Sequence, residues 1–239
     1  SHRFARLMPE VIISPTINRP NKLCHYSNTQ LRDLWIICMP LFAKSRETLR
    51  VLKEFRKIAP ALAYKMPEDD DKTSLGAMFE DTVKRYPDNS MLLFEGRHWT
   101  YAEFNAEVNQ MAHLLSDRGV VWGDTVAIFM ENRAEFILMM LALVKLGASA
   151  SLVNSSLSGA SLVYCINATN SRRCVVGEER AAVLAEVLGD LDLESGRDYF
   201  WVPDEGASKV PHWAEDVISA MAEMSFENLP ATREITAGE

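Results

Sequence analysis

The hydrophobic positions between residues 73 and 236 alternate between strand-like and helix-like patterns. Four short apolar runs with β-rich composition begin near Thr125, Ser149, Arg173 and Asp198, at intervals of 24, 24 and 25 residues. Stripes with a helical period lie between consecutive runs, so each interval holds one strand, one helix and short loops. Parallel strands need crossover connections of this length. The pattern therefore predicts an α/β fold with a parallel sheet and alternating helices.

Further elements are expected before the first of these runs. A helical stripe formed by Leu75, Met78, Phe79 and Val83 ends before Pro87. Two short strands, 91–94 and 98–100, flank Glu95-Gly96-Arg97 and predict a hairpin.

Three more helices are expected, and capping signals mark the first two. Thr100 and Glu103 have the spacing of a capping box and open a helix that Gly119 can stop. Asn132 and Glu135 have the same spacing, and they open an apolar helix over 136–146. A last amphipathic helix is expected to carry Trp213, Val217, Met221 and Met224.

The first 66 residues form a separate basic and apolar leader. Residues 46–62 have a helical period with an apolar arc opposite a basic arc, and residues 34–42 are apolar on all sides. Aromatic and cationic side chains in this arrangement favour an anionic membrane surface. We therefore predict membrane contact by Trp35, Phe42, Arg46, Arg50, Lys53, Arg56 and Lys57. The alternative is a helix packed on the rest of the protein with a solvated basic face.

Charge divides the chain at the same place. Residues 1–66 hold 12 Lys and Arg against 4 Asp and Glu, whereas residues 67–239 hold 13 against 29. A proline followed by an acidic run makes 67–72 a predicted linker between the leader and an α/β domain over 73–239. Because the larger part is strongly acidic and carries no binding motif, nucleic acid is not an expected partner.

Composition excludes several other classes of protein. The chain is 48% hydrophobic and 24% charged, which is typical of globular proteins. Its longest apolar stretches fall short of the roughly 20 residues of a membrane-spanning helix. The four cysteines, Cys24, Cys38, Cys165 and Cys174, have no CxxC spacing, so neither a zinc site nor a disulfide framework is expected.

A search for catalytic chemistry finds only single polar residues. His98 and His113 are the first candidates for acid–base work, but no carboxylate partner follows from their spacing. Asn154-Ser155-Ser156 follows a predicted strand, where open α/β sheets bind ligands, but a turn followed by a helix cap at Ser158 is the favoured interpretation. No catalytic, cofactor-binding or metal-binding residue is assigned.

Several segments together resemble a known family. They are 98–105, 123–136, 143–148 and 152–154, and in this order they are similar to the first part of the large domain of adenylate-forming enzymes. The similarity is greatest to the long-chain and very-long-chain acyl-CoA synthetases also called fatty acid transport proteins. This resemblance implies that a fatty acid carboxylate attacks the α-phosphate of ATP, and that the coenzyme A thiol then displaces AMP. ATP, Mg²⁺ and coenzyme A are the implied cofactors, and a long-chain fatty acid is the implied substrate.

The resemblance also implies what this chain lacks. In similar proteins a Ser/Thr/Gly-rich phosphate loop starts shortly after a position like Ile235. We therefore interpret the chain as an N-terminal fragment of such a ligase, inactive and without cofactors of its own, and marginally stable because sheet edges stay uncovered. The parent protein is expected in the cytoplasm or on the cytoplasmic face of a membrane. A non-catalytic lipid-binding or transport protein and another adenylate-forming acid ligase remain alternatives.

Overall fold

A computed structural model describes residues 51–56, 68, 71–204 and 208–236. The chain divides into two units, Ser1–Lys65 and Met66–Glu239. In the first unit residues 51–56 are helical, and their side chains are exposed, including those of Lys53 and Arg56. The other predicted membrane contacts, Trp35, Phe42, Arg46, Arg50 and Lys57, lie outside the described residues.

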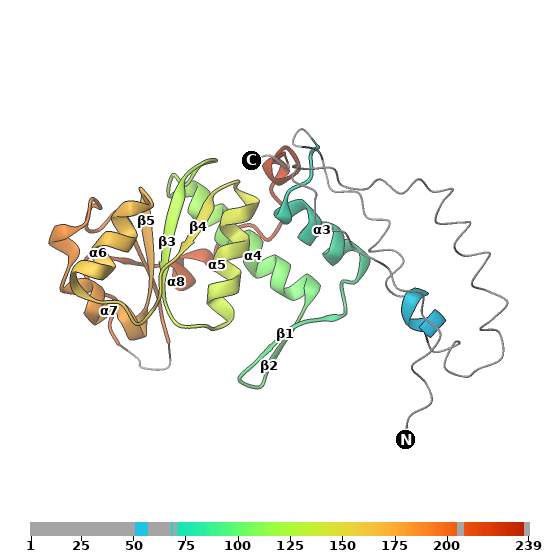
Figure 1. Ribbon diagram of the computed structural model, residues 1–239, viewed down its shortest axis with the longest axis horizontal. Coiled ribbons are helices and arrows are strands. Elements are labelled where there is room, and N and C mark those ends of the chain that lie inside the picture. The colour runs from blue at the N-terminus through green and yellow to red at the C-terminus, as the bar shows by residue number, and fades with distance from the viewer. Residues whose placement is uncertain (1–50, 57–67, 69–70, 205–207, 237–239) are drawn as a thin grey trace, which may run out of the picture. The chain divides into compact units, whose positions relative to one another are not determined.

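The second unit is built on a five-stranded sheet (Figure 1). Its strands are β3 (Thr125–Phe129), β4 (Ser149–Leu152), β5 (Arg173–Gly177), β6 (Tyr199–Val202) and β7 (Glu215–Asp216). Their order is β4-β3-β5-β6-β7, and each neighbouring pair is parallel. The predicted parallel sheet and its four strands are confirmed. The short fifth strand, β7, was not predicted.

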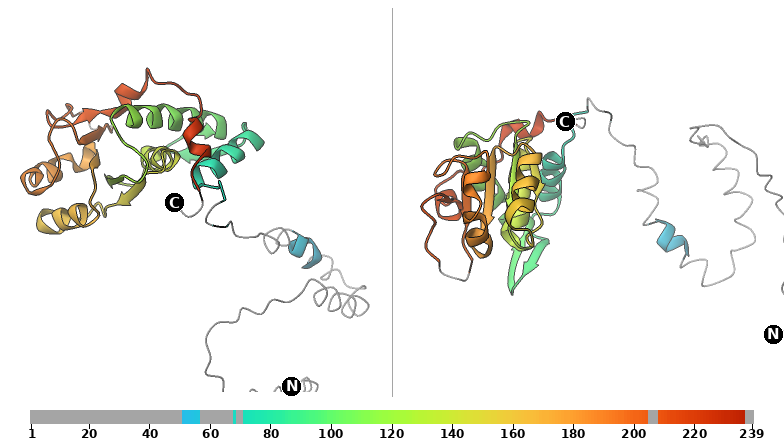
Figure 2. Two further views of the ribbon diagram at one scale, coloured as in Figure 1. Left: turned by 90° about the horizontal axis from the view of Figure 1, so that it is seen from above. Right: turned by 60° about the vertical axis from the view of Figure 1, so that its left-hand side comes forward.

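Alternate residues along each strand face two different helical layers. The helices are α4 (Tyr101–Asp117), α5 (Ala134–Lys145), α6 (Gly159–Ala168), α7 (Glu178–Ala185) and α8 (Val217–Met221). Val126 and Ile128 of β3 join the core under α4, α5 and α8, whereas Ala127 and Phe129 join the core under α6 and α7. Figure 2 shows the sheet between these layers. Because helices cover both faces of the sheet, the residues on both faces of these strands are apolar.

Residues 74–119 form a helix, a hairpin and then α4. The helix α3 (Leu75–Arg85) begins at Ser74, whose side chain accepts a hydrogen bond from the Ala77 N–H. The predicted hairpin is formed by β1 (Ser90–Phe94) and β2 (Arg97–Thr100), and the predicted capping box of Thr100 with Glu103 is present. The hairpin turn has positive φ at Glu95 and Gly96, the geometry of a type I′ turn.

The predicted apolar stripe of α3 is only partly correct. Leu75 and Met78 are 56% and 46% exposed, whereas Phe79 is buried together with the neighbouring Gly76 and Glu80. The buried face of α3 therefore includes a charged residue, Glu80. The reason is a charged cluster around Lys145, to which Glu80 contributes.

Three cap or boundary predictions are corrected. Residue Arg133, not Asn132, is the N-cap of α5, and it makes no capping hydrogen bond because a guanidinium group has no acceptor for a backbone N–H. Ser158 is the N-cap of α6, but its side chain caps nothing. The last helix does not include Trp213: residues 215–216 pair with β6, and Asp216 caps the five-residue α8.

The chain ends, within the described residues, in an irregular segment that contains a short 3₁₀ helix, η2 (Pro230–Arg233). Another 3₁₀ turn, η1 (Leu188–Asp190), follows α7. No helix in the part of the chain that the structure describes is both long and apolar enough to cross a membrane.

Candidate functional site

The carboxyl ends of the parallel strands are the first place to look for a ligand site. The chain leaves β3 toward β4 on one side and returns to β5 on the other, so the strand order reverses at β3. Open α/β sheets bind ligands in the crevice at such a switch point. The loops after β3, β5 and β6 meet there.

Arg133 occupies this switch point. It follows β3 and is only 8% exposed. Its Nη2 donates a hydrogen bond to the Val202 carbonyl at 3.0 Å, and its Nη1 lies 3.0 Å from an Asp204 carboxylate oxygen. Glu135 and Glu179 lie 3.6 Å from the guanidinium. The crevice is therefore filled by an ion-pair cluster of the protein itself, which we call the Arg133 cluster.

Two consecutive glutamates at the start of α7 tie the loops of the Arg133 cluster together. Glu179 Oε1 accepts a hydrogen bond from the Glu131 N–H at 2.7 Å, which joins the loop after β3 to the loop after β5. Gly177 makes room for this carboxylate, because a Cβ at that position would collide with it.

Glu178 closes the loop after β6. Its two carboxylate oxygens accept hydrogen bonds from the N–H groups of Asp204 and Ser208, each at 2.6 Å. The side-chain hydrogen bond with Ser208, followed by the two backbone hydrogen bonds, holds the pKa of Glu178 below its usual range. Glu178 therefore remains ionised and ties Asp204 and Ser208 to α7.

The polar residues named from the sequence do not converge on this cluster. Asn154 Oδ1 accepts hydrogen bonds from the N–H and the Oγ of Ser156, both at 2.9 Å, and so closes a turn within its own loop. His98 is exposed on β2, and His113 Nε2 lies 3.0 Å from the Glu227 carbonyl oxygen. The turn interpretation of Asn154-Ser155-Ser156 therefore fits the geometry.

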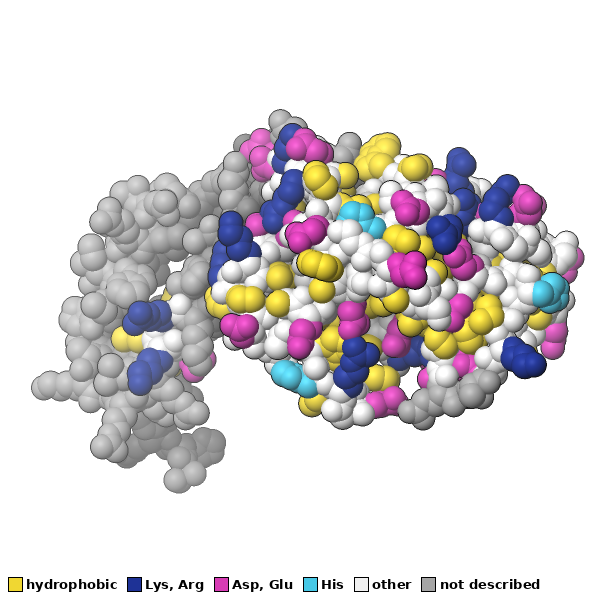
Figure 3. Space-filling model, turned by 180° about the vertical axis from the view of Figure 1, so that it is seen from behind, with side chains coloured by type: hydrophobic (Ala, Val, Ile, Leu, Met, Phe, Trp, Pro, Cys, Tyr) yellow, Lys and Arg dark blue, Asp and Glu magenta, His cyan; other side chains and the backbone are white. Residues whose placement is uncertain are grey.

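The chemistry of the Arg133 cluster does not suit ATP or magnesium. Glu131, Glu135, Glu178, Glu179 and Asp204 give this edge an excess of carboxylates over its arginine, and carboxylates repel phosphate groups. Among the described residues no group of three or more His, Cys, Asp and Glu could hold a metal ion. Figure 3 shows acidic side chains scattered over one face of the molecule rather than gathered in one place.

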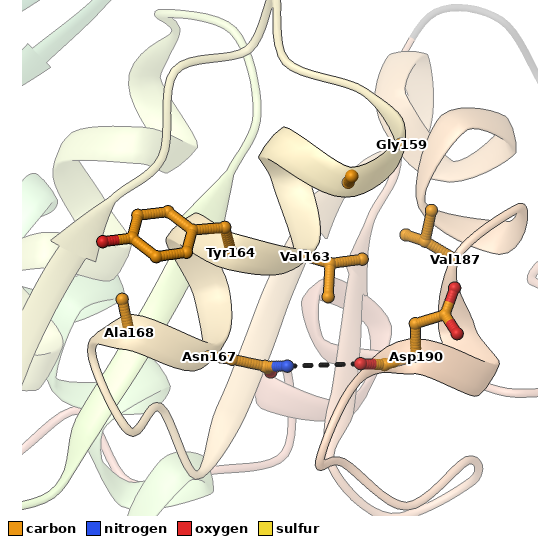
Figure 4. A pocket seen from close by; sticks show the side chains of 8 residues that line it. Gly159, Val163, Tyr164, Asn167, Ala168, Val187 and Asp190 are labelled. Carbon is orange, nitrogen blue, oxygen red and sulfur yellow. Dashed lines mark hydrogen bonds between the residues drawn. The ribbon is translucent and has the colours of Figure 1, made fainter.

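A broad open depression lies on the other side of the sheet, along α6 (Figure 4). Its volume is about 730 Å³, and its lining includes Val163, Tyr164 and Val187. The Asn167 side chain donates a hydrogen bond to the Asp190 carbonyl at 3.2 Å within it. Because Asp190 is the only carboxylate in this lining, the depression offers shape but no paired groups for acid–base catalysis.

A second charged cluster is buried between the helices and was not found from the sequence. Lys145 is fully buried, and its ammonium donates to Glu80 at 3.0 Å, Asn105 at 2.8 Å, Asn109 at 2.6 Å and Asn228 at 3.1 Å. We call these five residues the Lys145 cluster. Burial lowers the pKa of Lys145, and its hydrogen bond to Glu80 opposes that shift.

One signal could have revealed the Lys145 cluster. Lys145 ends α5, in which every residue between Glu135 and Lys145 is apolar, and a charge on such a helix must find partners when it is buried. Asn105 and Asn109 stand one helical turn apart on the buried face of α4, where they can both face one cation.

The two cysteines among the described residues, Cys165 and Cys174, are free thiols. Cys174 lies in the core and burial raises its pKa to about 12, so its thiol stays protonated. Cys165 on α6 is half-buried.

Comparison with known proteins assigns this chain to a family. A sequence model of the family described as AMP-binding enzyme matches residues 79–227, more than half of the chain. The chain belongs to the AMP-binding enzyme family. It is related to long-chain fatty acid transport proteins and acyl-CoA ligases, as the resemblance predicted.

Relatives with curated descriptions match about half of this chain. It is 38% identical over 116 residues to long-chain fatty acid transport protein 1 of Bos taurus, covering 48% of this chain and 18% of that protein. It is 32% identical over 126 residues to a medium/long-chain-fatty-acid–CoA ligase of Mycobacterium tuberculosis, covering 53% of this chain and 21% of the ligase. The matched residues thus span only a small part of each relative.

The fold also matches solved structures. A Mycobacterium tuberculosis fatty acyl CoA synthetase superposes with a TM-score of 0.55 at 20% identity, covering 69% of this chain and 31% of that one. The parallel sheet and its helices therefore correspond to the fold of the N-terminal domain of adenylate-forming enzymes.

Proposed function

We propose that this chain is the early part of the large domain of an AMP-forming ligase that joins long-chain fatty acids to coenzyme A. The observation that carries the proposal is the family match over residues 79–227. The relatives support the substrate class and the reaction, because one is named as a long-chain fatty acid transport protein and another as a medium/long-chain-fatty-acid–CoA ligase.

The described residues serve as scaffold in this proposal. The Arg133 cluster is too acidic to bind a nucleotide, and it is closed by its own ion pairs. Contacts to ATP, Mg²⁺ and coenzyme A therefore come from residues other than those described, and the 239-residue chain alone has no ligase activity.

A segment exchange tests the proposed function. Residues 79–227 replace the matching segment of the Mycobacterium tuberculosis medium/long-chain-fatty-acid–CoA ligase, and palmitoyl-CoA is measured with palmitate, ATP, Mg²⁺ and coenzyme A. We expect the chimera to form palmitoyl-CoA, because the segment supplies the same fold, and the isolated chain to form none. The unmodified ligase is the control.

Two outcomes would count against the proposal. A chimera that melts cooperatively like its parent but makes no acyl-CoA from any fatty acid rejects the ligase assignment. Palmitoyl-CoA formed by the isolated chain rejects its inactivity and requires a catalytic site within these residues.

The basic leader supports a further part of the proposal, attachment to a membrane surface. Trp35 and Phe42 would enter the interface, while Arg46, Arg50 and the lysines and arginine that follow would bind anionic headgroups. Such attachment places the enzyme on the cytoplasmic face of a membrane, where a sparingly soluble fatty acid partitions.

Sedimentation with lipid vesicles tests this attachment. The chain should bind phosphatidylserine-containing vesicles more strongly than pure phosphatidylcholine vesicles, and Arg46→Glu with Arg50→Glu should remove the difference. The matched control is Lys84→Glu with Arg85→Glu, which reverses two exposed charges on α3. Equal binding to both kinds of vesicle, or equal loss in the control, would remove the electrostatic part of the proposal.

A further inference from the structure

Phe226–Ile235 form an irregular segment that lies across three helices. We call this segment the strap. Figure 2 shows it running from α8 over α4 to the side of α3. Only Leu229, Thr232 and Ile235 of its ten residues are buried. A segment with so little buried surface is the kind that opens locally while the rest of a protein stays folded.

Side chains, rather than a backbone ladder, attach the strap to the helices. Asn109 Nδ2 donates to the Phe226 carbonyl at 2.7 Å, Thr232 Oγ1 donates to the Lys145 carbonyl at 3.0 Å, and Arg233 Nε donates to Glu80 at 2.8 Å. The strap's own backbone hydrogen bonds join its residues to one another, as from Thr232 to Leu229 and from Glu234 to Ala231.

One glycine leaves room for the strap. A Cβ added at Gly76 of α3 would lie 3.0 Å from Thr232 Cγ2, whereas a Cβ at Gly147 would collide with Trp122 Cδ1 at 2.4 Å and would only touch Ile235 Cδ1 at 3.4 Å. The strap therefore lies in a close-fitting seat that the helices and the loop before β4 provide.

Asn228 makes the central contact. Its single Oδ1 accepts hydrogen bonds from Asn105 at 3.1 Å, Asn109 at 2.9 Å and Lys145 at 3.1 Å. As a residue, Asn228 is exposed, so its amide reaches into the cluster from the surface.

The Lys145 cluster does not depend on Asn228 to satisfy the lysine. An ammonium group has three protons, and Glu80, Asn105 and Asn109 already supply three acceptors from α3 and α4. When Asn228 leaves, the Lys145 ammonium keeps these three partners, and water can reach the two amide donors through the opened surface. The seat is thus complete without the strap.

We propose that Phe226–Ile235 opens as a unit from a preformed seat, with Asn228 as its latch, while the sheet and helices stay folded. Opening uncovers Gly76, Gly147 and the polar rim of the Lys145 cluster.

Hydrogen–deuterium exchange of the 239-residue chain, read by mass spectrometry on peptides, tests the proposal. Asn228→Leu should accelerate exchange in peptides of the strap by about tenfold or more, because three donors lose their shared acceptor. Peptides from β3 and β5 should stay within roughly twofold of the unmodified chain. Asn154→Leu makes the same change in a turn outside the cluster and should leave strap exchange unchanged.

Asn228→Asp separates the latch from a general effect of substitution. It keeps an acceptor beside Lys145, so strap exchange should be no faster than in the unmodified chain. The proposal is overturned by unchanged strap exchange in Asn228→Leu, by equal acceleration of β3 and β5 peptides, or by failure of that variant to fold. It is also overturned when Asn228→Asp opens the strap as much as Asn228→Leu does.

Discussion

The Arg133 and Lys145 clusters each hold one cation against the parallel sheet's helical layer, but their surroundings differ. Arg133 faces three carboxylates that are 20–45% exposed. Lys145 faces one fully buried carboxylate and three neutral amide oxygens. Water can therefore replace partners of Arg133, but it cannot replace the buried Glu80, Asn105 and Asn109 around Lys145. The comparison indicates that charge governs the first cluster, whereas a fixed set of hydrogen bonds governs the second.

Removing the buried cation should have the largest effect on stability. Lys145→Met leaves the Glu80 carboxylate, which is 2% exposed, without its lysine and leaves two amide oxygens of α4 without a donor. Breaking a buried ion pair in this way destabilises proteins by about 3–5 kcal/mol. Urea denaturation followed by circular dichroism should show a loss of that size.

The control and the compensating variant make this first prediction specific. Lys84→Met makes the same change at an exposed position of α3 and should alter the unfolding free energy by less than about 0.5 kcal/mol. Adding Glu80→Leu to Lys145→Met should recover part of the loss, since no buried carboxylate then remains without its lysine, and the recovery should be incomplete because Arg233 also loses its contact with Glu80. A loss for Lys145→Met as small as that of Lys84→Met contradicts the view that the lysine is needed.

Removing Arg133 should destabilise the chain less, and the loss should depend on salt. Arg133→Met removes a charged hydrogen bond to the Val202 carbonyl and leaves the carboxylates of Glu179 and Asp204 to repel each other. At low salt the free energy of unfolding should fall by about 1.5–3 kcal/mol. Because these carboxylates are partly exposed, about 0.5 M NaCl should reduce that loss.

The two cations can then be compared directly by repeating both urea titrations at each salt concentration. The loss caused by Lys145→Met should not change with salt, because ions do not enter its buried cluster. Equal salt dependence for the two variants would show that the clusters do not differ in the proposed way.

The sheet could be predicted because its signal is local and regular. Spacings of 24 and 25 residues between β-rich runs leave room for one crossover helix, and β3, β4, β5 and β6 all follow. The fifth strand could not be predicted: Glu215 and Asp216 are acidic, and only their pairing with β6 makes them a strand. Short strands at a sheet edge owe their structure to the neighbour rather than to their own residues.

The two clusters could not be predicted from the sequence for a different reason. The partners of Lys145 are 36, 40, 65 and 83 residues away in the chain, so no spacing links them. Asn132 has the right spacing for a capping box, yet Arg133 is the N-cap of α5 and no side chain caps that helix start. The spacing of a capping box alone therefore does not decide where this helix begins.

The smallest effect is expected at the rim of the Arg133 cluster and depends on pH. The pKa of Glu178 is lowered in the folded chain, first by the side-chain hydrogen bond with Ser208 and then by two backbone N–H groups. A lowered pKa stabilises the folded state above the usual glutamate value of about 4.3, and this stabilisation is lost as the pH falls through the folded value. Glu178→Gln should therefore melt below the unmodified chain at neutral pH, and the gap should close in acid. Glu186→Gln, an exposed change beyond the end of α7, is the control in thermal melts across this range. A gap that is the same at neutral and acid pH would mean that geometry, not charge, holds this edge of the sheet.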